Sequence, residues 1–216
     1  VNWVDKDGNP AAILALSHDD PAQCQACLRL LLDKGADVNA ADKKGDTATI
    51  SADGKGAKEL EMMLDQSLKK FNRPPSTAEI ELVEKDKMAE CLRLLLDNGA
   101  DANAGNKEGD TAPMAAAGAG NAECLRMLLD KDADVNAMTE DGVTAVYIAA
   151  VGGFAECLRM LLDNGADANV MVDGSTAVFI AAGVDHAECL RVLLDNGADA
   201  NAVNKEGNTA VHNAAS

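Results

Sequence analysis

The chain has 216 residues, 47% of them apolar, and a formal charge of −17 at pH 7. An acidic chain is a poor ligand for nucleic acid or for an anionic membrane, because phosphate binding needs a surplus of Lys and Arg. We therefore expect no nucleic-acid and no membrane partner, and instead a protein with a neutral or basic surface or peptide. Only five residues are aromatic, so the core must consist of small and medium side chains. This composition favours packed helices over a β-sandwich.

Four of the six cysteines, Cys91, Cys124, Cys157 and Cys189, recur at intervals of 33, 33 and 32 residues. Equivalent helices of neighbouring repeats lie about 8–10 Å apart, which exceeds the roughly 7 Å between Cα atoms that a disulfide allows. Free buried thiols are typical of a reducing compartment, so we expect an intracellular, cytoplasmic protein. No run of residues approaches the ~18 apolar residues of a membrane span.

A helical block recurs five times along the chain. The pattern Glu-Cys-Leu-Arg-x-Leu-Leu-Asp begins at Glu90, Glu123, Glu156 and Glu188, and at Ala26 with alanine in place of glutamate. Its apolar residues fall at i, i+1, i+4 and i+5, which is one face of an α-helix. Four of the blocks are followed by a glycine where a left-handed C-cap residue would end the helix. These glycines are Gly35, Gly99, Gly165 and Gly197.

Each block is followed by Ala-Asp-Val/Ala-Asn, a turn that contains glycine, and a threonine. The threonines are Thr47, Thr111, Thr144, Thr176 and Thr209. Threonine is a good N-cap residue, so we expect a short first helix after each one. Alanines at fixed offsets in these first helices let the next unit approach closely. The unit is therefore a hairpin, a first helix, a turn and a second helix.

This pattern resembles the ankyrin repeat, a unit of about 33 residues that runs Gly-x-Thr-Pro-Leu-His-x-Ala-Ala and ends in Gly-Ala-Asp-Val-Asn. The resemblance covers essentially the whole chain and implies an all-α solenoid of helix-turn-helix units with β-hairpin loops. The Thr-Pro-Leu-His box reads Thr-Ala-Val-Tyr from Thr144 and Thr-Ala-Val-Phe from Thr176, so most of its prolines and histidines are missing. The family's histidine hydrogen-bond network is therefore in question here.

The register predicts one domain over residues 1–216, with six to seven repeats that begin near residues 5, 42, 73, 106, 139, 172 and 204. We expect both terminal units to be truncated. The first unit carries about four extra residues around His18. The unit from 73 is divergent, because its hairpin reads Lys-Lys-Phe-Asn-Arg-Pro-Pro from Lys69 and its first helix carries Leu82 and Val83 where alanines are expected. Bulky residues there predict a discontinuity in the stack near residues 66–90.

The residues of catalytic and metal chemistry form no recognisable site. Cys24 and Cys27 make a formal CxxC, but no second pair and no histidines stand at ligand spacing. We interpret Cys27 as a core residue and Cys24 as incidental. We therefore expect no enzyme, no metal and no cofactor. Arg29, Arg126 and their equivalents precede an aspartate by four residues, which indicates exposed ion pairs on a solvated face more than a docking stripe.

The resemblance implies that partners bind the concave face, formed by hairpin tips and first helices. Carried across by register, this surface comprises Lys107, Glu108, Asp110, Ala115, Glu140, Asp141, Val143, Tyr147, Ile148, Asp173, Ser175, Phe179 and Ile180. Tyr147 and Phe179 occupy equivalent positions in adjacent units. They either replace the lost histidines in the core or form an aromatic hot spot with Ile148 and Ile180.

Three functions follow as hypotheses. The first is a monomeric protein-interaction module that acts as an adaptor, inhibitor or targeting domain. The second is a structural or engineered scaffold without a dedicated partner, because the helical blocks are nearly identical. The third rests on the resemblance alone. Ankyrin asparagines are substrates of an asparaginyl hydroxylase that prefers a leucine eight residues upstream, which points to Asn39 and Asn136.

Overall fold

The structure is a computed structural model that describes residues 4–5, 9–16, 21–49 and 89–214. The chain falls into two compact halves, Val1–Lys107 and Glu108–Ser216. The loop around His18, the basic hairpin from Lys69 and almost all of the expected discontinuity lie outside the described residues. The division into seven repeats within one domain therefore stays a prediction.

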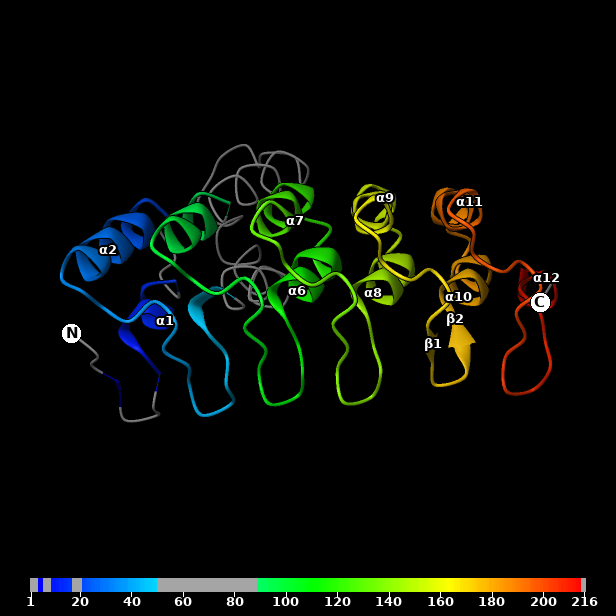
Figure 1. Cartoon of the computed structure of the whole chain (residues 1–216), viewed down its shortest axis with the longest axis horizontal. Helices are drawn as coiled ribbons and strands as arrows, with labels where there is room; N and C mark the ends of the chain where they lie inside the picture. Colours follow the sequence, from blue (N-terminus) through cyan, green and yellow to red (C-terminus); the bar gives the residue numbers. More distant parts are fainter. Residues whose placement is uncertain (1–3, 6–8, 17–20, 50–88, 215–216) are drawn as a thin grey trace, which may run out of the picture. The chain divides into compact units, whose positions relative to one another are not determined.

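The C-terminal half is built of two layers of helices (Figure 1). The first helices pack side by side in one layer, and the second helices lie in the other. The first helices are α6 (Ala112–Gly118), α8 (Ala145–Gly152), α10 (Ala177–Gly183) and α12 (Ala210–Ala214). The second helices are α7 (Ala122–Leu129), α9 (Ala155–Asp163) and α11 (Ala187–Asp195). The expected all-α repeat fold is confirmed.

Small residues hold the first helices together, and leucines fill the space between the layers. Ala116, Ala117 and Ala149 have no exposed surface, which lets neighbouring first helices approach closely. Leu125 and Leu158 of the second helices are likewise completely buried. Burial of such leucine side chains contributes roughly 1.5–3 kcal/mol each, and it ties the two layers of each repeat together.

Two of the five predicted threonines, Thr144 and Thr176, cap the following helix with their side chains, whereas the buried Thr47 hydroxyl has no hydrogen-bond partner. Thr144 Oγ1 accepts a hydrogen bond from the Tyr147 N–H, and Thr176 Oγ1 accepts one from the Phe179 N–H, both at 3.3 Å. Thr111 begins α6 without a side-chain cap, and its buried hydroxyl has no hydrogen-bond partner. The predicted capping is therefore confirmed for α8 and α10.

The second helices end at a left-handed residue, as predicted. Gly165 and Gly197 have φ values of 86° and 82°. In the block that ends α7, Asp132 takes the same place with φ 58°. A side chain in this conformation costs about 1–2 kcal/mol, which the glycines avoid.

One hairpin is shorter than the others, which explains the single cysteine interval of 32. Strands β1 (Met171–Val172) and β2 (Ser175–Thr176) pair antiparallel, with Met171 opposite Thr176. Asp173 and Gly174 form the two-residue turn, and both have positive φ values, 48° and 79°. Asp-Gly is a preferred sequence for such a turn.

The N-terminal half contains α1 (Ala11–Ala15), α2 (Pro21–Asp33) and a helix of residues 89–97. Ile13, Leu28, Cys91 and Leu95 belong to one core cluster, so the helix of residues 89–97 packs with α1 and α2. The hairpin after residue 41 lies beside the loop of residues 106–107, because the Lys107 N–H donates to the Lys44 carbonyl at 3.0 Å. Segments about 60 residues apart in sequence are therefore neighbours in this half.

One asparagine per repeat joins its loop to the next. Asn136 Oδ1 accepts from the Asp167 N–H at 2.8 Å, and its Nδ2 donates to the Gly165 carbonyl at 3.1 Å. Asn169 binds the loop of Gly197 and Asp199 in the same way. Asn39 makes the equivalent pair of contacts with Gly99 and Asp101 in the N-terminal half.

The cysteines are free and mostly buried. The interpretation of Cys24 as incidental is wrong: it is buried, whereas Cys27 is only partly buried. Because α2 begins at Pro21, Cys24 lies within the helix, where it belongs to the core cluster. Burial, with the nearby Cys24 and Glu90, raises the pKa of the Cys91 thiol from 9.0 to about 11, although Arg29 opposes the shift.

Replacement of Asn136 by alanine should lower the free energy of unfolding by about 1–2 kcal/mol, because two hydrogen bonds between repeats are lost. Asn201 occupies the same loop position, but the described residues contain no later loop to receive its amide. Asn201→Ala should therefore change stability by less than about 0.5 kcal/mol. Urea unfolding followed by circular dichroism measures both, and equal losses would contradict the bridging role.

Stability should also fall in alkaline solution because of Cys91. The raised folded-state pKa means that folding favours the neutral thiol, a contribution that is complete below pH 9 and is lost as the pH rises towards 11. The loss should reach about 2 kcal/mol between about pH 8 and pH 11. Urea unfolding of the wild type and Cys91→Ala at both pH values measures it, and the variant should lose less. Parallel losses in the two proteins would refute the assignment.

Candidate functional site

Two neighbouring hairpin tips of the C-terminal half are held against each other by their backbones. The Glu140 N–H donates to the Glu108 carbonyl at 3.1 Å. A Cβ at Gly109 would lie 2.9 Å from the Thr139 Cα, so only glycine allows this close approach. The hairpin tips of this half lie in a row (Figure 1), and the backbone contact fixes the spacing of these two.

The tips are acidic and exposed. Glu108, Glu140, Asp141 and Asp173 all reach solvent. Asp173 forms an ion pair with Lys205 of the next hairpin, and the hydrogen bond from that ammonium group lowers the pKa of the Asp173 carboxyl group. The row thus presents several carboxylates, and one of its few cations is already engaged.

The structure leaves every predicted surface residue at least partly exposed. Lys107 belongs to the N-terminal half, where its ammonium group donates to the Lys43 carbonyl at 2.6 Å. The other twelve belong to the C-terminal half. Glu108, Glu140, Asp141 and Asp173 are exposed, and the rest are partly buried: Asp110, Ala115, Val143, Tyr147, Ile148, Ser175, Phe179 and Ile180.

Tyr147 and Phe179 are neither fully buried in the core nor fully exposed. They occupy equivalent positions in α8 and α10, two helices that pack on each other, and both side chains are partly buried. Ile148 contributes to packing, since a Cβ at Gly118 would lie 3.2 Å from its Cγ2 atom. These side chains thus support the first-helix layer and also contribute to its surface.

Seven exposed large apolar residues among those described in this half were not part of the predicted surface, and two of them, Leu194 and Val211, lie in α11 and α12. Met138, Met171 and Val203 lie in consecutive hairpins, and Val151 and Val184 lie at the ends of α8 and α10. The sequence carried a signal for the three hairpin residues, because each precedes the threonine of its own hairpin by five or six positions. Only the structure shows that these side chains are exposed.

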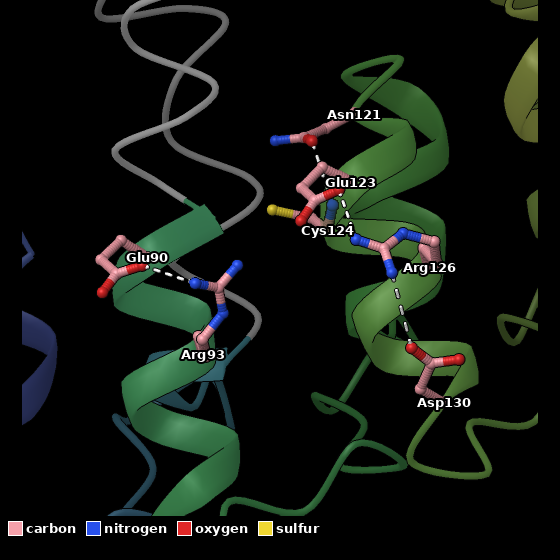
Figure 2. A network of polar contacts seen from close by, with 7 residues as sticks. All are labelled: Glu90, Arg93, Asn121, Glu123, Cys124, Arg126 and Asp130. Atoms are coloured by element: carbon pink, nitrogen blue, oxygen red, sulfur yellow. Dashed lines mark hydrogen bonds and ion pairs between the residues drawn. The ribbon is translucent and has the colours of Figure 1, made fainter.

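Arg126 in the second helix α7 makes the predicted ion pair and a shorter one that was not predicted (Figure 2). The Arg126 guanidinium lies 2.7 Å from the Glu123 carboxylate and 3.9 Å from that of the predicted partner, Asp130, so the pair with Glu123 is the shorter one. Helical side chains point back towards the N-terminus, so the arginine meets the glutamate three residues earlier. The Arg93–Glu90 pair, at 2.9 Å, repeats this geometry in the helix of residues 89–97.

Some of these glutamates also bind an arginine of the preceding repeat. Arg159 lies 3.1 Å from Glu188, and Arg29 lies 3.8 Å from Glu90. The side chains are about half exposed, so each pair contributes only about 0–1 kcal/mol. These exposed ion pairs are consistent with the predicted solvated face.

The residues of potential catalytic or metal chemistry stay apart in the described part of the chain. His186 Nε2 lies 3.1 Å from the Val151 carbonyl, and His212 Nδ1 lies 2.9 Å from Thr209 Oγ1. Three or more His, Cys, Asp or Glu side chains nowhere converge on a possible ion position among the described residues. No helix in the same residues has the length and hydropathy to cross a bilayer.

The two asparagines that resemble modification sites hold structural positions. The side-chain amides of Asn39 and Asn136 bind the backbone of the next repeat, as described above. Modification of either residue would therefore act on a contact between repeats.

Comparisons with known proteins agree with this architecture. Residues 80–172 match the family model for ankyrin repeats in three copies, residues 185–216 match the model for many copies, and residues 7–43 match the single-repeat model. The chain is also 36% identical over 98 residues to "Ankyrin repeat and SOCS box protein 6" of Homo sapiens and of Pongo abelii. Each match covers 45% of this chain and only 17% of the relative. The chain belongs to the ankyrin repeat family.

Proposed function

We propose that this chain binds a partner protein through the hairpin tips and first helices of its C-terminal half. Ankyrin repeats are generally protein–protein interaction modules and typically lack enzymatic activity. The fold thus supports a binding role, and the proposal assigns that role to the surface residues named above.

The observation that carries the proposal is the combination of partly buried aromatic side chains and acidic tips on one packed layer. Tyr147 and Phe179 are partly exposed, and so are the residues that follow them in the two helices, Ile148 and Ile180. Large aromatic side chains with a rim of polar residues are typical of binding hot spots. The layer is fixed by alanine packing and by backbone contacts between hairpins, so binding requires little ordering of this surface.

The acidic rim favours a partner with a neutral or basic surface or peptide. The chain would act as an adaptor, an inhibitor or a targeting domain inside the cell, as a monomer. In this role the carboxylates accelerate encounter, and the apolar residues supply most of the affinity.

Affinity capture with the 216-residue chain as bait tests the proposal. The chain should retain a partner saturably, and the Tyr147→Ala/Ile148→Ala variant should bind that partner at least about 30-fold more weakly, because hot-spot truncation costs about 2 kcal/mol or more. Circular dichroism must show that the variant remains folded.

Leu30→Ala provides the matched control, since Leu30 is an exposed apolar residue of α2 in the N-terminal half. This control should bind like the wild type. Equal binding by the double variant would refute the assigned surface. The absence of any saturable partner would instead favour a scaffold without a dedicated partner.

A further inference from the structure

Five of the seven exposed large apolar side chains described in the C-terminal half occupy two repeat positions, and the other two, Leu194 and Val211, lie in α11 and α12. Met138, Met171 and Val203 are 57%, 54% and 49% exposed, and each is the bridge partner of the threonine that begins the following helix. We call these three residues the hairpin row. Val151 and Val184 are 45% and 47% exposed and lie at the C-terminal ends of α8 and α10, away from the hairpins. We call them the helix-end pair.

The spacing of the two sets follows from the repeat. First helices that pack directly lie about 8–10 Å apart, so successive members of the hairpin row are separated by about the same distance. Val151 follows the capping Thr144 by seven residues, which is about 10 Å along α8. The two sets are thus separated by roughly the width of one α-helix.

Carboxylates flank both sets. Glu140 and Asp141 are exposed two and three residues after Met138. Asp185 is exposed directly after Val184 and holds a left-handed conformation with φ 59°. Lys205, which lies near Val203, forms an ion pair with Asp173. An occupant of this surface therefore needs apolar side chains flanked by positive charge.

We propose that the hairpin row and the helix-end pair bind one amphipathic α-helix of a partner protein, with apolar residues a heptad apart and Lys or Arg beside them. Residues one heptad apart in a helix are separated by about 10.5 Å, which matches the spacing of the hairpin row. Side chains on one face of an extended strand recur every 6.5–7 Å or so, which does not match. This inference rests on the proposed function and specifies the class of partner.

Fluorescence anisotropy with a designed probe tests the inference. The probe is a fluorescein-labelled helical peptide with leucines a heptad apart and lysines beside them. It should bind the 216-residue chain saturably. Two matched peptides, one with Glu in place of Lys and one with Gln in place of Leu, should each bind about tenfold more weakly or worse.

Variants of the chain locate the site. Met138→Gln/Met171→Gln should weaken binding of the leucine–lysine probe by about tenfold or more, because two apolar contacts are lost. Leu30→Gln removes an equally exposed apolar side chain elsewhere and should change affinity by less than about twofold. All these positions are exposed, so the variants should remain folded, which circular dichroism checks.

Four outcomes would overturn the inference. In the first three, the wild type fails to bind the probe, the double variant binds the probe as tightly as the wild type, or Leu30→Gln weakens probe binding as much as the double variant does. The fourth is self-association: sedimentation that shows a dimer of the wild type and a monomer of the double variant would assign the surface to a second copy. The proposed function is tested separately by Tyr147→Ala/Ile148→Ala, so the two failures are distinguishable.

Discussion

The geometry of the proposed surface depends on the side-chain amides of Asn136 and Asn169, which join neighbouring loops of the C-terminal half. Asn136 and Asn169 each accept one backbone N–H and donate to one carbonyl of the next loop, so two consecutive loops share a single relative position. Apolar packing alone would let neighbouring repeats slide, because it is not directional. The amide contacts add direction to the packing between layers and thereby fix the register of hairpin against hairpin.

This fixed register gives the proposed binding surface its spacing. The hairpin tips contact each other through Glu108 and Glu140, and the first helices pack through alanines. Side chains at one repeat position therefore recur at one distance along the layer. Under the proposed function, a partner that matches this distance with one regular element would contact Met138 and Met171 at the same time.

The sequence was sufficient for most features that depend on local chemistry and periodicity, with the missing side-chain cap of Thr111 as an exception. Glycine at the end of a second helix and threonine before α8 were predictable, because each choice satisfies a backbone requirement within a few residues. Burial of Cys24 and pairing of Arg126 with Glu123 were not, since they depend on where α2 begins and on side-chain direction. The exposure of Met138 and the contacts of Asn136 depend on the neighbouring repeat, which a pattern within one repeat does not specify.

The central claim is that the asparagine contacts between repeats persist in solution and fix the surface. Amide hydrogen exchange of the folded chain tests it directly at the donors to the asparagine oxygens, Asp167 and Asp199. These loop amides are exposed, so they exchange at nearly unstructured rates unless the contacts persist. The account predicts that they exchange about as slowly as the amides of α8 and α9. Rapid exchange at both residues, with α8 and α9 still protected, would contradict it.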